Sequence, residues 1–318
     1  ENAVAATNYN YVFNNTRITS IPTNCFNGSN ASSVNSFNKN KLVDIKDNGL
    51  NGLLIDDGYF ENCTSLINVG DNIINETFSP IRLFNGCISL RTIGNMNFSQ
   101  AKGTDRTFSN CKNLMNLEGF KNSKGEPTIS KDFNISDSSK LTKQSLLNIS
   151  DSLVPQTSST IKTLFLSDES LALLTDVEKL VIINKYWNLN GYTPNITEQI
   201  AKDLVLELKG SPGLTANIVE TTSLYYYVNL VNTDASENVG RYVVDKAIGY
   251  VYDYDNAPEY EYNIKISTDG VTYKEYWLPK GADGDSDTTI LRNKLVELNR
   301  ETPIDGIDIG DDNSKAYH

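Results

Sequence analysis

The stretch Phe84-Asn-Gly-Cys87-Ile-Ser-Leu90-Arg-Thr-Ile93 decides the fold, because close copies of it stand at one constant interval before it and after it. The copies are Phe60-Glu-Asn-Cys63-Thr-Ser-Leu66-Ile-Asn-Val69 and Phe108-Ser-Asn-Cys111-Lys-Asn-Leu114-Met-Asn-Leu117. All three fit the pattern F-x-[NG]-C-x-x-L-x-x-[VIL] without gaps. Repetition at a fixed period of this kind indicates a repeat architecture.

Two earlier units extend the repeat toward the start of the chain. Phe13 and Phe37 are each followed by two aliphatic residues in nearly the same phase, and together with Phe60, Phe84 and Phe108 they recur at an almost constant interval. A unit of about 24 residues is too small to bury its apolar face alone. We therefore expect neighbouring units to stack into a solenoid.

Stacking turns the repeated positions into ladders with one rung per coil. The Leu-x-x-[VIL] part of each unit is expected to form a short strand, and the positions between its buried residues point outward on a surface suited to binding. The abundant Asn and Gly tolerate left-handed backbone and suit the turns. The predicted inward ladder consists of Phe13, Phe37, Phe60, Phe84, Phe108, Cys63, Cys87, Cys111, Leu66, Leu90 and Leu114.

The F-x-N-C-x-x-L pattern resembles the leucine-rich repeats of the BspA-like kind, which occur on bacterial surface proteins and in some phage virion proteins. The resemblance covers about residues 8–125. It implies a leucine-rich-repeat solenoid, and it is specific to the class of repeat and not to any one ligand.

Three of the four cysteines, Cys63, Cys87 and Cys111, occupy one equivalent repeat position. Buried free thiols are the preferred interpretation, since free Cys is among the most buried residue types. A disulfide between rungs and a metal site stay as weaker alternatives, because the spacing lacks the paired C-x-x-C or His of a zinc site. Cys25 is out of phase and is given no ladder role.

Segment 126–191, after the predicted solenoid at 1–125, is expected to form an α/β cap that closes its exposed end. Thr142 is the predicted N-cap of a first helix, and Thr175 opens a second helix with a capping box. Trp187, in a closing strand, is expected to anchor the core of the cap rather than to hold a ligand.

Segment 192–280 is predicted to be a β-rich, sandwich-like domain, so that the whole chain is mainly β with an α+β cap. Residues 196–210 fit a helix stopped by Gly210, or one that gives way to a strand. Between Tyr262 and Trp277, two runs of alternating apolar and polar residues meet at Asp269-Gly270. This arrangement is typical of a β-hairpin. Further strands are predicted from Tyr and Val content at 224–231, 241–244 and 249–254.

Segment 281–318 is predicted to contain a connector, a short helix and an acidic tail. Its Gly-x-x-Gly start resembles the short connectors of phage fibre proteins. Asp283, Asp285 and Asp287 alternate as at the start of an EF-hand loop, but Thr288 and Lys294 replace the Gly and Glu that such a loop needs. A solvated acidic turn is preferred, and calcium binding there stays open.

Composition argues against most enzyme chemistry. The net charge of −12 disfavours nucleic acid as a partner, and the one His is the last residue, His318. Catalytic triads and His-metal sites are therefore nearly excluded. No apolar run is long enough to cross a membrane as a helix. We predict no cofactor and no metal, and a glycosidase using paired carboxylates ranks last among the functions considered.

Tyrosines form two further groups in the β-rich segment. Tyr225, Tyr226 and Tyr227 are consecutive, whereas Tyr250, Tyr252 and Tyr254 alternate and could place their rings on one sheet face. The alternating three are candidate binding or interface aromatics, with a core or subunit-interface role preferred over a sugar platform.

The expected function is a non-enzymatic structural or receptor-contacting component of a phage virion, located in its tail, baseplate or fibre. Its partners would be other virion proteins and a host receptor or glycan, with homo-oligomerisation open. The alternative is a bacterial cell-surface adhesin. The chain begins at Glu1 rather than Met, and its first repeat lacks a recognisable cap. We therefore expect further polypeptide or a partner subunit before it.

Overall fold

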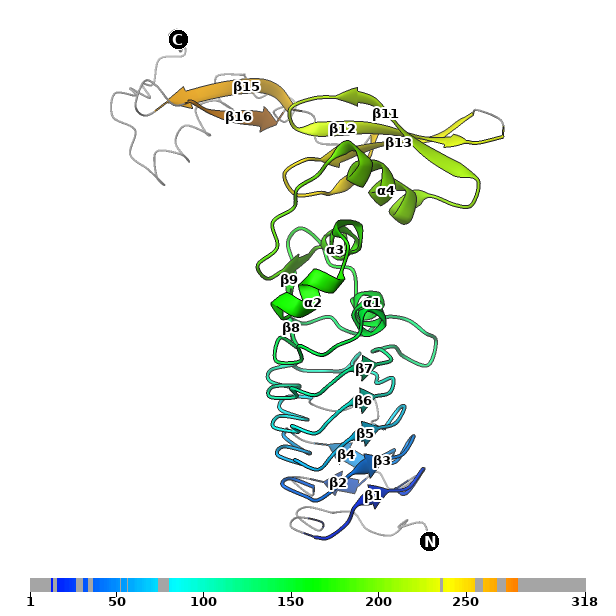
Figure 1. Ribbon diagram of the computed structural model, residues 1–318, viewed down its shortest axis with the longest axis vertical. Helices are drawn as coiled ribbons and strands as arrows, with labels where there is room; N and C mark the ends of the chain where they lie inside the picture. Colours follow the sequence, from blue (N-terminus) through cyan, green and yellow to red (C-terminus); the bar gives the residue numbers. More distant parts are fainter. Residues whose placement is uncertain are drawn as a thin grey trace. The chain divides into compact units, whose positions relative to one another are not determined.

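The computed structural model (Figure 1) describes residues 13, 16–26, 31–33, 37–51, 53–55, 57–73, 80–234 and 237–254, together with the backbone of 260–267 and 273–279. The chain forms two compact units, Glu1–Val251 and Tyr252–His318. Everything described below up to Val251 belongs to the first unit.

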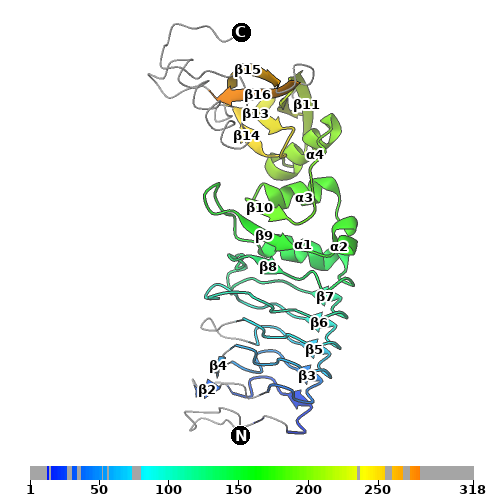
Figure 2. The same cartoon turned by 90° about the vertical axis from the view of Figure 1, so that its left-hand side faces the viewer.

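The repeat region is a parallel solenoid, as its period predicts. Five two-residue strands form one sheet in the order β1-β3-β5-β6-β7, each displaced from the next by one repeat unit. A second short parallel pair, β2 (Ala31–Ser33) and β4 (Leu53–Ile55), lies on the other side of the coils (Figure 2). The five strands are β1 (Ser20–Ile21), β3 (Asp44–Ile45), β5 (Asn68–Val69), β6 (Thr92–Ile93) and β7 (Asn116–Leu117).

The aromatic rungs stack through the interior of the coils. The rings of Phe60 and Phe84 lie 5.6 Å apart between centroids, and those of Phe84 and Phe108 lie 5.8 Å apart, both nearly parallel. Phe13 stacks on Phe37 at 4.8 Å and is itself partly buried. The other phenylalanines, cysteines and leucines of the ladder named above have almost no solvent exposure. One continuous apolar core therefore runs through all the coils.

The cysteine position forms a second ladder, made of hydrogen bonds. The Sγ of Cys63 donates to the carbonyl of Phe37, and the Sγ of Cys87 donates to the carbonyl of Phe60. The Sγ of Cys111 donates in the same way to the carbonyl of Phe84, at 3.2 Å. In the shortened unit, Asn40 takes the same place and donates its Nδ2 to the carbonyl of Phe13. A thiol small enough for the core thus satisfies a buried carbonyl of the preceding coil.

Left-handed backbone explains the Asn or Gly that precedes each cysteine. Asn62 and Asn110 have φ of 60°, and Gly86 at the equivalent position has φ of 76°. Asn and Gly are the residues that adopt this region at least strain. The turn chemistry expected from the sequence is therefore present at the repeated position.

Helix α1 (Lys143–Ser152) ends the sheet by supplying polar side chains where a further strand would supply backbone. Ser145 Oγ donates to the carbonyl of Met115 and accepts from the N–H of Leu117. Asn148 Nδ2 donates to the carbonyl of Leu117, and Ser152 Oγ accepts from the N–H of Phe120. The edge left by β7 is satisfied by one face of a helix.

The rest of the cap continues the same core. A parallel sheet, β10-β9-β8, comprises β8 (Phe133–Asn134), β9 (Lys162–Phe165) and β10 (Trp187–Leu189), accompanied by α2 (Asp168–Leu173) and α3 (Asp176–Ile183). The predicted N-cap Thr142 and the Thr175–Glu178 capping box are confirmed, whereas α2 was not predicted. Trp187 is buried and donates its Nε1–H to the carbonyl of Val154 at 2.9 Å.

The β-rich part that follows is a four-stranded antiparallel sheet with α4 (Glu198–Lys209) against one face. Residues 196–210 thus take the fully helical alternative. The sheet order is β11-β12-β13-β14, and its second layer is this helix. Its strands are β11 (Leu214–Thr221), β12 (Tyr225–Asn232), β13 (Asn238–Asp245) and β14 (Val251–Asp253).

Helix α3 joins the cap to this sheet. Leu180 packs in the core under the sheet, whereas Ile182 packs in the core of the solenoid and cap. Asn184, after α3, donates its Nδ2 to the carbonyl of Gly249 and accepts from the N–H of Val251, both at 2.8 Å. The solenoid, cap and sheet therefore share packing and hydrogen bonds.

In the second unit, β15 (Tyr260–Ser267) and β16 (Tyr273–Pro279) pair antiparallel, as the hairpin pattern predicts. The Asp269-Gly270 turn, the connector at 281–286, the predicted short helix and the acidic tail lie outside the described residues.

Candidate functional site

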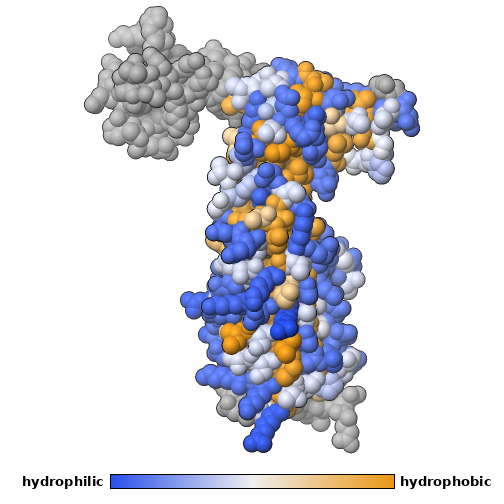
Figure 3. Space-filling view, in the orientation of Figure 1, coloured by the Kyte–Doolittle hydropathy of each residue, from blue (hydrophilic) through white to orange (hydrophobic). Residues whose placement is uncertain are grey.

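One outward row of side chains on the solenoid is placed by the repeat itself. Each member directly follows the buried Leu of its unit. Met115 is 41% exposed, Arg91 is exposed, and Val43 and Ile67 are half-buried. Figure 3 shows apolar groups over the solenoid and again over the cap, interrupted by hydrophilic side chains. We call Val43, Ile67, Arg91 and Met115 the strand-face row.

A chain of backbone hydrogen bonds fixes the row. The N–H of Ile67 donates to the carbonyl of Val43, that of Arg91 to Ile67, and that of Met115 to Arg91, at 2.8 to 3.0 Å. The carbonyl of Met115 accepts from the N–H of Thr142, where the cap begins. The side chains therefore stand on a rigid, regularly spaced support, which favours binding with little loss of conformational entropy.

Carboxylates lie on one side of the row, where they follow the row member in three of its four coils. Asp47 Oδ1 accepts from the N–H of Asp71, and Asp71 Oδ1 accepts from the N–H of Asn95. Glu118, which is exposed, follows in the next coil. We call Asp47, Asp71 and Glu118 the acidic column.

Burial, together with the acidic column, raises the pKa of one member of the column. Partial burial, the nearby charges of Asp71 and Asp47 and a hydrogen bond with Asp71 all raise the pKa of Glu118. Lys46 pairs with Asp44 at 2.7 Å near the start of the column. Within the described part of the chain, Asp71 and Glu118 have no cationic partner. Asp71 and Glu118 therefore present unneutralised negative charge, whereas Lys46 lies near Asp47.

Positive charge lies on the other side of the row, where lysines precede the row member in two of its four coils. Lys41 and Lys112 are exposed there. Lys140 donates to Asn113 Oδ1 at 2.6 Å, and Asn113 in turn donates to the carbonyl of Ile88. The strand face is thus an apolar row between a basic side and an acidic side, a pattern that orients a charged partner.

The alternating tyrosines differ in burial and in their contacts. Tyr250 is half-buried, its ring lies 5.0 Å from that of Tyr186 in the cap, and burial raises its pKa. Tyr252 is half-buried and Tyr254 is 43% exposed. Tyr225 is buried, and its ring lies 6.4 Å from that of Tyr227. The structure brings Tyr250 into a packing contact with the cap.

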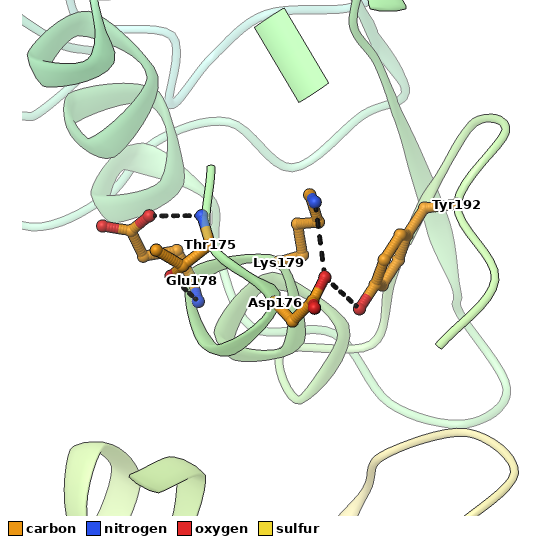
Figure 4. Close-up of polar contacts among 5 residues, drawn as sticks. All are labelled: Thr175, Asp176, Glu178, Lys179 and Tyr192. Atoms are coloured by element: carbon orange, nitrogen blue, oxygen red, sulfur yellow. Dashed lines mark hydrogen bonds and ion pairs between the residues drawn. The ribbon is translucent and has the colours of Figure 1, made fainter. Parts of the chain in front are cut away.

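A polar cluster at the start of α3 is occupied by its own contacts (Figure 4). Glu178 accepts from the N–H of Thr175, and its other oxygen pairs with Lys143 at 2.9 Å. Asp176 contacts both Lys179 and the hydroxyl of Tyr192 at 3.4 Å. Burial and Asp176 raise the pKa of Tyr192 to about 12. These groups tie the helix start to neighbouring segments.

The ladder cysteines are free thiols held in an unreactive state. All four cysteines are unpaired, and burial raises the pKa of Cys63 and Cys111 to about 12. Burial also raises the pKa of Cys87 well above its usual value. Thiolate is the reactive form, so these residues are structural.

Alkylation is expected to separate Cys25 from the ladder. Cys25 is only half-buried, so iodoacetamide at pH 8 should modify it first, while Cys63, Cys87 and Cys111 react only after denaturation. Peptide mass spectrometry of native and urea-treated samples reads the sites directly. Native modification of Cys87 at a rate near that of Cys25 would contradict a closed core.

The described residues lack a metal-type cluster and a membrane-spanning helix. They contain no group of three or more His, Cys, Asp or Glu side chains arranged to hold a metal ion. None of their helices is long and apolar enough to cross a membrane. Asp283, Asp285 and Asp287, the open calcium candidates, lie outside the described residues.

Comparisons with known proteins gave no match. No family model, no curated protein and no solved structure matches the chain. The assignment of function therefore depends on the surface just described.

Sequence reasoning located the strand face but missed its chemistry. Gly70 and Gly94 precede Asp71 and Asn95, and a Cβ on either glycine would overlap the Asp side chain of the preceding coil. The signal was present, since Asp47, Asp71 and Asn95 recur at the period of the repeat. It was hidden because the aromatic and cysteine positions dominate the repeat.

Proposed function

We propose that this protein is a non-enzymatic, structural or receptor-contacting component of a phage virion, in its tail, baseplate or fibre. The observation that carries the proposal is the strand-face row, a rigid line of partly exposed apolar groups and one arginine. Exposed apolar groups on a solenoid are typical of binding surfaces. The repeat pattern, which resembles the BspA-like leucine-rich repeats, supports this class of protein.

The proposed partners are other virion proteins and a receptor or glycan of the host, and the proposed location is the extracellular virion. A bacterial cell-surface adhesin is the second candidate, because BspA-like repeats also occur on bacterial surfaces. Both candidates use the same strand face.

Purified particles distinguish the two candidates. An antibody against the chain is applied to gradient-purified phage particles and to the envelope fraction of cells from the same source. Sedimentation of the chain with particles is the expected result. A chain found only in the envelope fraction would overturn the virion assignment in favour of an adhesin.

Cell attachment tests whether the strand face is the surface used. Fluorescently labelled protein is incubated with host cells, and bound protein is measured by flow cytometry. Met115→Asp is expected to reduce attachment, whereas Ile161→Asp, on a residue of nearly equal exposure in the cap (43% against 41%), should leave it unchanged. Equal attachment by both variants would exclude the strand face as the contact surface.

A further inference from the structure

The strand-face row contains an unused positive charge. Arg91 is exposed and lies between Ile67 and Met115 in the row. Within the described residues its guanidinium makes no ion pair and no hydrogen bond. Arginine and methionine are enriched in protein interfaces, and lysine, glutamate and aspartate are depleted there. An arginine held between apolar neighbours is suited to a carboxylate on a partner.

The acidic side of the row fixes a second requirement on the partner. Asp71 and Glu118 lack a cationic partner in the described residues, and the charge of Asp71 opposes ionisation of Glu118. A partner lying along the row would relieve this repulsion by placing a basic residue against the acidic column. The complementary surface is therefore apolar and acidic along its centre, and basic along one flank.

The spacing of the coils selects the conformation of that partner. Neighbouring strands lie about 4.8 Å apart, so the four members of the row span about 14 Å. An α-helix with a pitch of about 5.4 Å presents positions i, i+3, i+7 and i+10 over about 15 Å. An extended segment repeats its side chains on one face only about every 6.8 Å and loses register by the third rung.

Sugar chemistry fits the row less well. Its members contribute three aliphatic or thioether side chains and no aromatic ring. Sugars stack on aromatic rings and require several polar groups, whereas a helix in contact with an apolar row requires neither.

We propose that the strand-face row binds an amphipathic α-helix of a partner protein. The helix presents apolar residues to Val43, Ile67 and Met115, an acidic residue to Arg91, and basic residues to the acidic column. This inference rests on the proposed function, since it names the partner of the same strand face.

A designed peptide tests the inference. The probe is a labelled, stapled helix of about 18 residues with Leu at i, i+3 and i+10, Glu at i+7 and Lys on one flank. Its binding to the full chain is followed by fluorescence anisotropy. A second peptide carries Lys in place of that Glu, and a third is a scrambled helix of the same composition.

Charge reversal gives the decisive comparison. Arg91→Glu is expected to weaken the Glu peptide by at least about tenfold and to restore binding of the Lys peptide. Arg82→Glu, which changes an arginine outside the row, should alter neither. Equal affinity for the scrambled helix, no response to Arg91→Glu, or no binding of any peptide would overturn the inference.

The outcomes separate this inference from the proposed function. If no peptide binds but Met115→Asp still reduces cell attachment, the helix partner is wrong and the strand face remains the contact surface. Binding of a purified host glycan that Arg91→Glu leaves intact would replace the helix by a sugar ligand. If Met115→Asp has no effect on attachment, the proposed function of the face fails as well.

Discussion

Replacing Phe84 by alanine is expected to lower the free energy of unfolding by about 3–5 kcal/mol. The ring is fully buried and stacks on Phe60 and Phe108, at 5.6 Å and 5.8 Å. Its loss removes apolar burial and leaves a cavity between coils whose backbone is fixed by hydrogen bonds to both neighbours. Urea unfolding followed by circular dichroism measures the change.

The matched control for Phe84 is Ile88→Ala in the same coil. Ile88 is 48% exposed, so its truncation should change the free energy of unfolding by less than about 1 kcal/mol. A Phe84→Ala variant that unfolds at the same urea concentration as the wild type would show that the rings do not form a continuous core.

Gly94→Ala is expected to destabilise the solenoid by about 3 kcal/mol, the upper end of the usual effect of overpacking. An added Cβ would overlap Asp71 Oδ1 and lie 2.7 Å from both the N of Asp71 and the C of Gly70. The last two atoms belong to the backbone of the neighbouring coil, so a change of rotamer cannot relieve the contact. The Asp71 hydrogen bond to Asn95 would be displaced as well.

Gly103→Ala is the control for this substitution. The nearest atom to a Cβ there is Ile81 Cδ1 at 3.3 Å, which is the flexible end of a side chain. We expect a change well under about 1 kcal/mol, with thermal unfolding as the readout. Equal loss of stability in the two variants would show that the close approach of the coils at Gly94 is not the cause, because the lower unfolded-state entropy of alanine favours the folded state in both variants.

The solenoid could be predicted from the sequence because the same pattern of buried residues occurs in every unit. Phe, Cys and Leu recur in phase, and each recurrence is an independent sample of the same packing environment. Helix capping was also predictable, since Thr142 and Thr175 act on neighbouring residues. Local patterns of this kind do not depend on distant parts of the chain.

Features that depend on contacts across the chain were not predictable. Helix α1 was predicted from its apolar face, but its polar face is what ends the sheet, through Ser145 and Ser152. The end of segment 196–210 fits either helix or strand by local pattern, and packing against the four-stranded sheet accompanies the helix. The sequence shows these residues without showing which backbone groups they meet.

The candidate site also has one part that was predictable from the sequence and one part that was not. The outward row follows from the strand period, so its position was predictable. The isolation of Arg91 depends on which charges lie in the neighbouring coils and how they pair. That information is absent from a single repeat unit, because each unit carries a different residue at this position.

Helix α1 also bears on how the length of the solenoid can change. Ser145, Asn148 and Ser152 contact backbone atoms of the last coil, and every coil offers equivalent atoms. Recombination between the repeats of the gene could therefore add or delete one whole repeat unit without redesigning the terminus. Each event would change the solenoid length by about 4.8 Å, the spacing of one coil. The length of the solenoid could therefore change during evolution in steps of one coil.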